Sequence, residues 1–189
     1  MYTKILQDSS FYIVLKTIDQ DIAAKTRDNH CQKCAGHLHV ANYHRKPRGE
    51  PKRLPQDFSL RYSFCCSREG CRIRTTPPSV RFMGRRVWLA PIFIVAAMLM
   101  GDSSPKKIRH FMRELGVSYD LVRKWRKWWQ QVFSRSQRWT FLKGWLAIPV
   151  CDNKIPETLL AFFQQNSPCA AEGLVRTLNF LNHHDLLWS

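Results

Sequence analysis

The stretch RYSFCCSREGCRIRTTPPSVRF (Arg61–Phe82) contains three cysteines and five arginines within 22 residues. Closely spaced thiolates are typical metal ligands, and a tetrahedral site needs four of them, usually two from each of two tight turns. A second cysteine pair lies upstream in the sequence Cys31-Gln-Lys-Cys34, and thirty residues separate it from Cys65. The two clusters therefore predict a single metal site.

The third ligand is either Cys65 or Cys66. Cys66 and Cys71 form a C-x4-C turn with Gly70 where tight geometry needs it, whereas Cys65 would form a C-x5-C turn. Strand alternation also places Cys66 on the same face as Phe64, at the inward end of a strand, which favours Cys66. The predicted ligands of one structural Zn²⁺ are Cys31, Cys34, Cys66 and Cys71.

Four histidines surround the first cysteine pair, but four cysteines already complete a tetrahedral set. His37-Leu38-His39 nevertheless resembles the His-hydrophobic-His strand with which nucleases that nick single-stranded DNA bind a divalent metal. A two-residue step does place both imidazoles on one strand face. The tripeptide lies three residues after Cys34 within a small ribbon, so two solvated histidines are the favoured interpretation and a nicking enzyme is the alternative.

A second strong pattern is SPKKIRHFMRELGVSYDLVRKWRKWWQQVF (Ser104–Phe133). It predicts a helix over about 105–115, a turn at Gly116, where positive φ is cheap only without a Cβ, and a second helix capped by Ser118. On the second helix one sector is apolar, formed by Leu121, Val122, Trp125, Trp128, Trp129 and Val132. The opposite side carries Arg123, Lys124, Arg126 and Lys127. The apolar stripe is expected to pack on the protein, and the cationic stripe then stays exposed, where it could enter a nucleic-acid groove.

ELGVSYDLVRKW (Glu114–Trp125) resembles a helix-turn-helix recognition unit, with Met112 where a small residue is usual. The resemblance implies that Ser118, Tyr119, Asp120 and Arg123 approach base edges, while Lys124, Lys127, Lys106 and Lys107 meet phosphates. The preceding apolar helix would be the first of three. Arginines from the cysteine region are expected to extend this cationic surface: Arg72, Arg74, Arg81, Arg85 and Arg86.

Charge is concentrated in two blocks of the chain, whose 189 residues carry a net +16. Residues 44–86 hold 12 Lys/Arg against 3 Asp/Glu, and residues 105–143 hold 11 against 2. Two dense basic blocks separated by neutral segments favour a polyanion partner, above all nucleic acid.

The sequence disfavours a membrane-spanning protein and an exported one. The longest apolar run, Val87–Met100, is 14 residues long and contains Pro91, whereas a membrane span needs about 20. Charged residues interrupt the N-terminus, so we expect no secretory signal and a cytoplasmic, nucleoid-associated protein. With no export expected, the seven cysteines favour metal ligation over disulfides.

The predicted organisation is mainly α with a small β zinc ribbon. It comprises an N-terminal helix (1–30), a four-cysteine zinc ribbon (31–82), a helix-turn-helix unit (83–133) and a helical tail (134–189). Apolar faces in the tail either cover the tryptophan-rich helix or bind a partner or a second copy, because groove-reading proteins often need two half-sites.

A four-cysteine ribbon followed by a helix-turn-helix is similar to the N-terminal DNA-binding parts of insertion-sequence transposases and their accessory proteins. The resemblance implies a zinc-containing protein that recognises duplex DNA, as a mobile-element subunit working with a transposase or as a transcriptional regulator. Such transposases cut DNA with three acidic residues on an RNase-H-like fold. The acidic residues of 134–189 lie in a short helical tail, so we expect no enzyme. RNA binding through the ribbon is the alternative.

Overall fold

The computed structural model describes residues 1–45, 54, 57–83, 88–146 and 150–182. Its helices are α1 (Tyr2–Gln7), α2 (Ser9–Asp28), α3 (Ala90–Asp102), α4 (Pro105–Leu115), α5 (Tyr119–Gln131), α6 (Gln137–Lys143), α7 (Glu157–Gln165) and α8 (Ala170–Asn182), with short 3-10 turns η1 (Phe133–Arg135) and η2 (Asp152–Lys154). Its strands are β1 (Leu38–Val40), β2 (Tyr43–His44), β3 (Leu60–Arg61), β4 (Phe64–Cys66) and β5 (Arg74–Thr75). The expectation of a mainly helical chain with a small sheet is confirmed.

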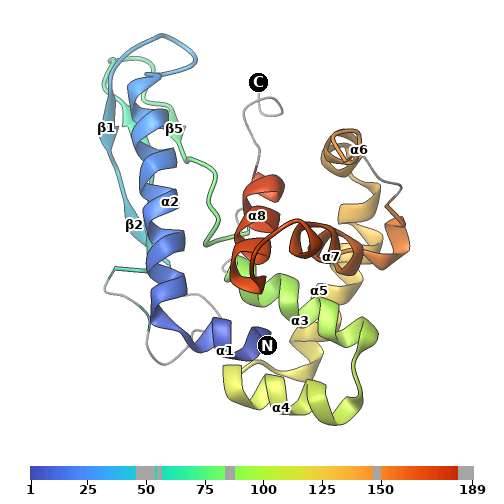
Figure 1. Cartoon of the computed structure of the whole chain (residues 1–189). Coiled ribbons are helices and arrows are strands. Elements are labelled where there is room, and N and C mark those ends of the chain that lie inside the picture. The colour runs from blue at the N-terminus through green and yellow to red at the C-terminus, as the bar shows by residue number, and fades with distance from the viewer. Residues whose placement is uncertain (46–53, 55–56, 84–87, 147–149, 183–189) are drawn as a thin grey trace.

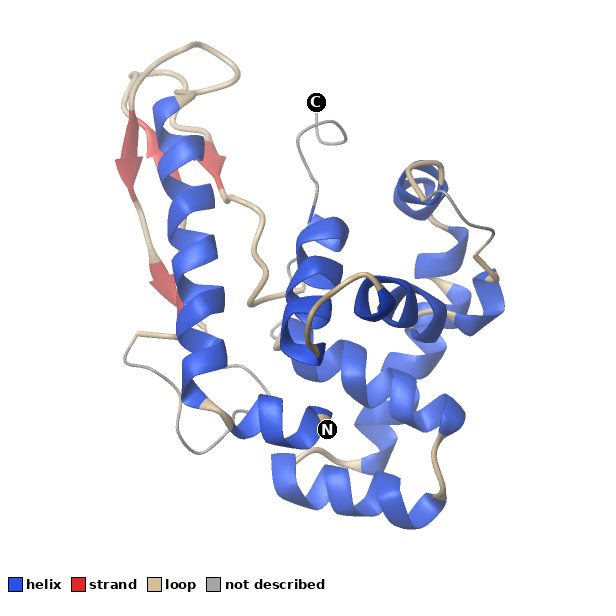
Figure 2. Cartoon of the chain, in the orientation of Figure 1, coloured by secondary structure: helices blue, strands red, loops and turns tan. Residues whose placement is uncertain are grey.

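Helix α2 lies lengthwise beside the strands, and α3 to α8 gather on the other side of α1 (Figures 1 and 2). The carboxylate of Asp8 caps α2 by accepting the backbone N–H of Ser10 at 2.9 Å. Ser9 and Ser10 begin the helix itself.

The strands form two small antiparallel sheets. β4 is central in the order β1-β4-β5, and β2 pairs with β3. The sequence predicts two uninterrupted strands over 37–43 and 58–64, but both break near Asn42 and Ser63. The Asn42 side chain accepts the backbone N–H of Ser63 at 3.0 Å and replaces a ladder hydrogen bond there. This interruption separates the metal end of the strands from the end that packs on the large core.

Two hydrophobic clusters hold the chain together. The larger one joins the first half of α2 to α3, α5, α7 and α8, and α3 is buried on every side from Ile92 to Ala97. The smaller one contains Ala23, Cys31, Leu38, Phe64 and Cys66. Leucines of α7 and α8 belong to the same cluster as Trp125 and Trp129, so the apolar side chains of the tail pack into the large core of the same chain.

No helix among the described residues is both long and apolar enough to cross a bilayer. The apolar run predicted as a buried helix over 87–100 forms α3, which begins with Pro91 in its first turn. The N-cap residue, Leu89, has extended backbone, as N-cap residues typically do.

Candidate metal centre and basic helical face

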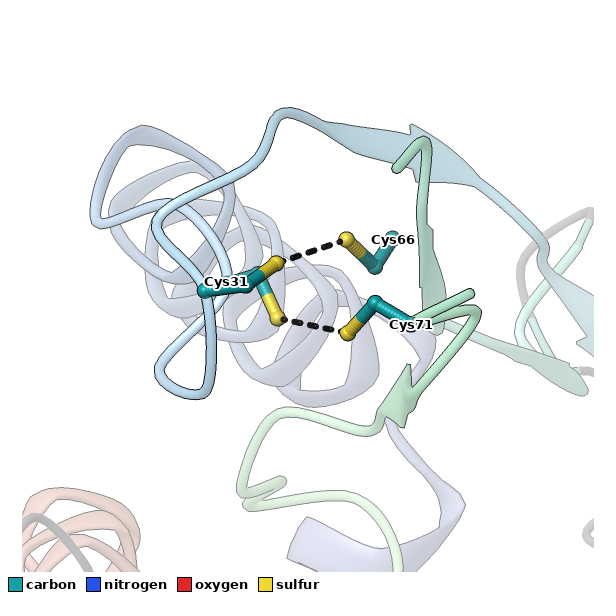
Figure 3. Close-up of side chains that lie close together, drawn as sticks. Cys31, Cys66 and Cys71 are labelled. Atoms are coloured by element: carbon teal, nitrogen blue, oxygen red, sulfur yellow. Dashed lines mark hydrogen bonds between the residues drawn. The ribbon is translucent and has the colours of Figure 1, made fainter. Parts of the chain in front are cut away.

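Four cysteines from two distant parts of the chain converge at one end of the strands. The sulfurs of Cys31, Cys34, Cys66 and Cys71 all lie within 4.8 Å of one another. Cys31 Sγ is 3.8 Å from Cys71 Sγ, and Cys34 Sγ is 3.4 Å from Cys66 Sγ. Figure 3 shows Cys31, Cys66 and Cys71 pointing toward a common centre. Ligands about 2.3 Å from a tetrahedral metal ion lie about 3.8 Å apart, so this arrangement fits one ion.

Two turns of related geometry present the sulfurs. In the first, Cys31 N–H donates to Gly36 O at 2.9 Å and Ala35 N–H donates to Cys31 O at 2.7 Å. In the second, Cys71 N–H donates to Arg68 O at 3.1 Å. The residue after the last cysteine of each turn has positive φ, 54° at Ala35 and 44° at Arg72. Gly70, with φ 80°, confirms the expected tight turn.

Gly36 gives the sulfurs room to approach one another. A Cβ at this position would lie 3.1 Å from Cys66 Sγ and 3.4 Å from Cys34 Sγ. The backbone N–H of Gly36 also lowers the pKa of the Cys34 thiol to about 7, with help from the Cys66 side chain. At Cys66 the backbone N–H of Arg68 lowers the pKa, but burial and the neighbouring thiols outweigh it and raise the value to about 12. Metal binding must therefore displace protons from this cluster.

Cys65 lies outside the cluster, as its place on the opposite face of β4 predicts. Its Sγ lies 3.5 Å from Arg72 O, and its Cα pairs with His39 and Arg74 on the neighbouring strands. His37 and His39 are both exposed, and the His37 ring contacts that of His30 at a centroid distance of 4.9 Å. Within the part of the chain that the structure describes, the four cysteines are the only group of potential ligands for a metal.

Helices α4 and α5 flank the turn that the sequence predicts. Gly116 has φ 61°, and Val117 N–H donates to Met112 O at 3.0 Å. The Ser118 hydroxyl accepts Leu121 N–H at 3.3 Å and caps α5. Val117 is buried between the helices. The turn and the cap are thus confirmed in their local geometry.

The apolar side of α5 packs around Phe93 of α3. The Phe93 ring lies against four indoles, with centroid distances of 4.9 Å to Trp88, 5.4 Å to Trp125 and 5.3 Å to both Trp128 and Trp129. Such aromatic pairs add about 0.5–1.5 kcal/mol each beyond burial. Val132 departs from the predicted apolar sector because α5 ends before it, and it is exposed.

The opposite side of α5 keeps its cations in solvent. Arg123, Lys124 and Lys127 are exposed, as are Lys106 and Lys107 on α4 and Ser118, Tyr119 and Asp120 at the start of α5. Arg123 lies 3.3 Å from Asp120, and both side chains stay largely exposed. Arg126 is different, because it turns inward to pair with Glu157 of α7 and to donate to Ala97 O. Gly101 leaves the space that this pair occupies.

Arg81 was expected on the cationic surface, and that expectation is wrong. The Arg81 side chain is fully buried and pairs with Asp19 of α2 at 2.7 Å. It also donates to Phe58 O at 2.7 Å and Leu60 O at 2.9 Å. Each of the three guanidinium nitrogens donates a hydrogen bond inside the protein, and the buried side chain cannot reach a DNA phosphate. Arg72 and Arg74 are exposed, and Arg85 and Arg86 lie outside the described residues.

Two buried charged residues had not been predicted from the sequence. Asp19 lies on α2 between Ile18 and Ile22 and has 1% of its surface exposed. Arg61 has only 5% of its surface exposed, although it begins a stretch of five arginines. The signal available for Asp19 was its position four residues after Leu15, on the buried side of a helix with 3.6 residues per turn.

Comparisons with protein-family models, with curated proteins and with solved structures return no match for this chain.

Proposed function

We propose that this chain is a zinc-containing protein that recognises duplex DNA through α4 and α5, arranged as a helix-turn-helix with α3 as its first helix. The observation that carries the proposal is the two-sided character of α5. Its buried tryptophans fix the helix on α3. Among the described residues, the only ion pair of its exposed cations is the exposed contact of Arg123 with Asp120. An α-helix of this kind fits the major groove, with residues at its N-terminus nearest the base edges.

The metal in this proposal is Zn²⁺ in a ribbon formed by the strands and the two cysteine turns. A set of four thiolates favours zinc or iron–sulfur chemistry. The four cysteines occupy every tetrahedral position, so the ion is structural and leaves no place for a substrate. Four thiolates around a divalent ion carry about two net negative charges, and the turns supply Lys33, Arg68 and Arg72 nearby. The expected roles are a recognition subunit of a mobile element or a transcriptional regulator.

Reversing two charges on the exposed side of α5 tests the DNA proposal. Arg123→Glu with Lys127→Glu removes two cations and adds two anions, so affinity for duplex DNA should fall about 100-fold or more. Fluorescence anisotropy with a labelled duplex at fixed salt measures this. Arg135→Glu with Lys154→Glu is the matched control, because both residues are exposed outside α4 and α5 and the net charge changes equally.

Equal loss in both double variants would mean that only total charge matters and would contradict the role of α5. Unchanged affinity in the α5 variant would contradict it as well. Selection of bound sequences from random duplexes separates the alternatives further. A consensus supports groove recognition, whereas preferential binding of single-stranded RNA in competition at matched salt would favour the RNA-binding alternative.

A further inference from the structure

We propose that Tyr43, Arg45, Arg61 and Arg74 form a binding site for a phosphodiester group of the nucleic-acid backbone. These four residues, called the Tyr43 cluster below, come from strands β2, β3 and β5 and the residue after β2. The inference rests on the proposed function, to which it adds a second contact far from α5 in the sequence. Neither Tyr43, Arg45 nor Arg61 was predicted as a contact residue.

Guanidinium groups from three segments gather around one tyrosine. The Cζ atoms of Arg45 and Arg74 lie 5.2 Å and 5.8 Å from the centroid of the Tyr43 ring. Arg45 Nη2 also donates to the Tyr43 hydroxyl at 3.0 Å. Arg61 is the direct cross-strand partner of Tyr43 in the β2–β3 pair. Stacking on an aromatic ring orders a guanidinium group in the unbound protein, so these groups are positioned before any ligand binds.

The buried part of this cluster has an unmatched positive charge. The Arg61 Nη2 donates to Pro77 O, but Arg61 Nη1 is buried with no partner among the described residues. Burial is the main cause that lowers the pKa of Arg61; among the nearby groups, Asp19 and Tyr43 raise it, and the charges of Arg81 and Arg45 lower it by less. A buried donor without a partner and a buried cation beside like charges are both costly.

Asp19 does not supply the missing counter-charge. One of its carboxylate oxygens accepts Val80 N–H at 2.7 Å, and the other accepts the Arg81 guanidinium at 2.7 Å and the Ser79 hydroxyl. Arg81 therefore takes up the charge of this carboxylate. The ion pairs among the described residues involve neither Arg61 nor Arg74, and we assign the charges of these two guanidinium groups to the proposed anion.

Phosphate matches what the cluster offers. Guanidinium groups bind phosphate oxygens through planar, paired N–H donors and are weakly hydrated, so they are the preferred partners of phosphate in proteins. Arg74 is exposed and can donate directly, whereas buried Arg61 adds a fixed positive charge in a region of low dielectric. Arg72, two residues before Arg74 and also exposed, lies on the approach to the same strand.

The experiment has two parts, both made with the full-length, zinc-loaded protein. In the first, inorganic phosphate replaces chloride at constant ionic strength while the arginine Nε–Hε resonances are followed by NMR. Resonances of Arg61 and Arg74 should shift and saturate, and in Arg74→Gln the Arg61 response should be lost. Lys25→Gln, an equal charge change on the exposed side of α2, should respond like the wild type.

The second part measures affinity for duplex DNA as a function of salt. Arg74→Gln should reduce the slope of log affinity against log salt by about 0.9, the value of one phosphate contact, and Lys25→Gln should not. Phosphate-induced shifts with an unchanged slope would refute the assignment to the DNA backbone. Absence of the shifts would refute the site itself. A wild-type protein that fails to bind DNA would overturn the proposed function, and the phosphate titration would still decide whether the site exists.

Discussion

Replacing Cys66 with serine should abolish stoichiometric zinc binding and unfold the strand region while leaving α3 to α8 folded. The reason is the division of the core. The smaller hydrophobic cluster has only five buried residues, of which Cys31 and Cys66 are two. So small a core does not sustain a fold without a metal or cross-link. Zinc bound by comparable sites contributes about 10–16 kcal/mol to folding, whereas the larger cluster lies on other elements.

Zinc content by elemental mass spectrometry and hydrogen exchange by peptide measure the two effects. We expect one zinc ion per wild-type chain, almost none in Cys66→Ser, and fast exchange confined to the metal end of the strand region, residues 31–40 and 64–75 of the variant. Cys65→Ser is the matched control, since its sulfur is adjacent in sequence but outside the cluster. Zinc loss in both variants, or a wild-type protein that folds fully without metal, would contradict the assignment.

The two cysteine turns and the α4–α5 turn could be predicted because each depends on residues close together in sequence. Cys66 could be preferred to Cys65 because alternation in a strand decides which side chain points inward. Gly116 and Ser118 are likewise fixed by local backbone geometry, a left-handed conformation and a cap. The structure agrees at each of these positions.

The charges were harder to place because partners distant in sequence decide whether an arginine is buried. Arg81 and Arg74 look alike in the sequence, yet one pairs with Asp19, 62 residues away, and the other is exposed. The same holds for Arg126, which sits at the edge of the cationic side of α5 and is drawn inward by Glu157 of α7. Periodicity predicts which face of a helix is polar, but it does not identify the polar residue for which another element provides a partner.

Replacing Arg81 with alanine should destabilise the zinc-bound protein by about 3–5 kcal/mol, because it leaves the carboxylate of Asp19 buried without its ion pair. Asp19→Ala should lower the free energy of unfolding by a similar amount. It leaves the Arg81 guanidinium buried without its ion pair and removes the acceptor of Val80 N–H and the Ser79 hydroxyl. The double variant should lose less stability than the two single variants added together, because removing both side chains leaves neither charge buried without its partner.

The free energy of unfolding, measured by urea denaturation with zinc present throughout, gives this double-mutant cycle. Asp21→Ala and Lys25→Ala are the matched controls, because both side chains are exposed on α2, and each should change stability by about 0.5 kcal/mol or less. If Arg81 instead contacted DNA, Arg81→Ala would weaken duplex binding while leaving the free energy of unfolding unchanged. That outcome would refute the buried pair as the link between α2 and the strands. Loss of stability with strong coupling to Asp19 would establish that this arginine holds the protein together rather than its ligand.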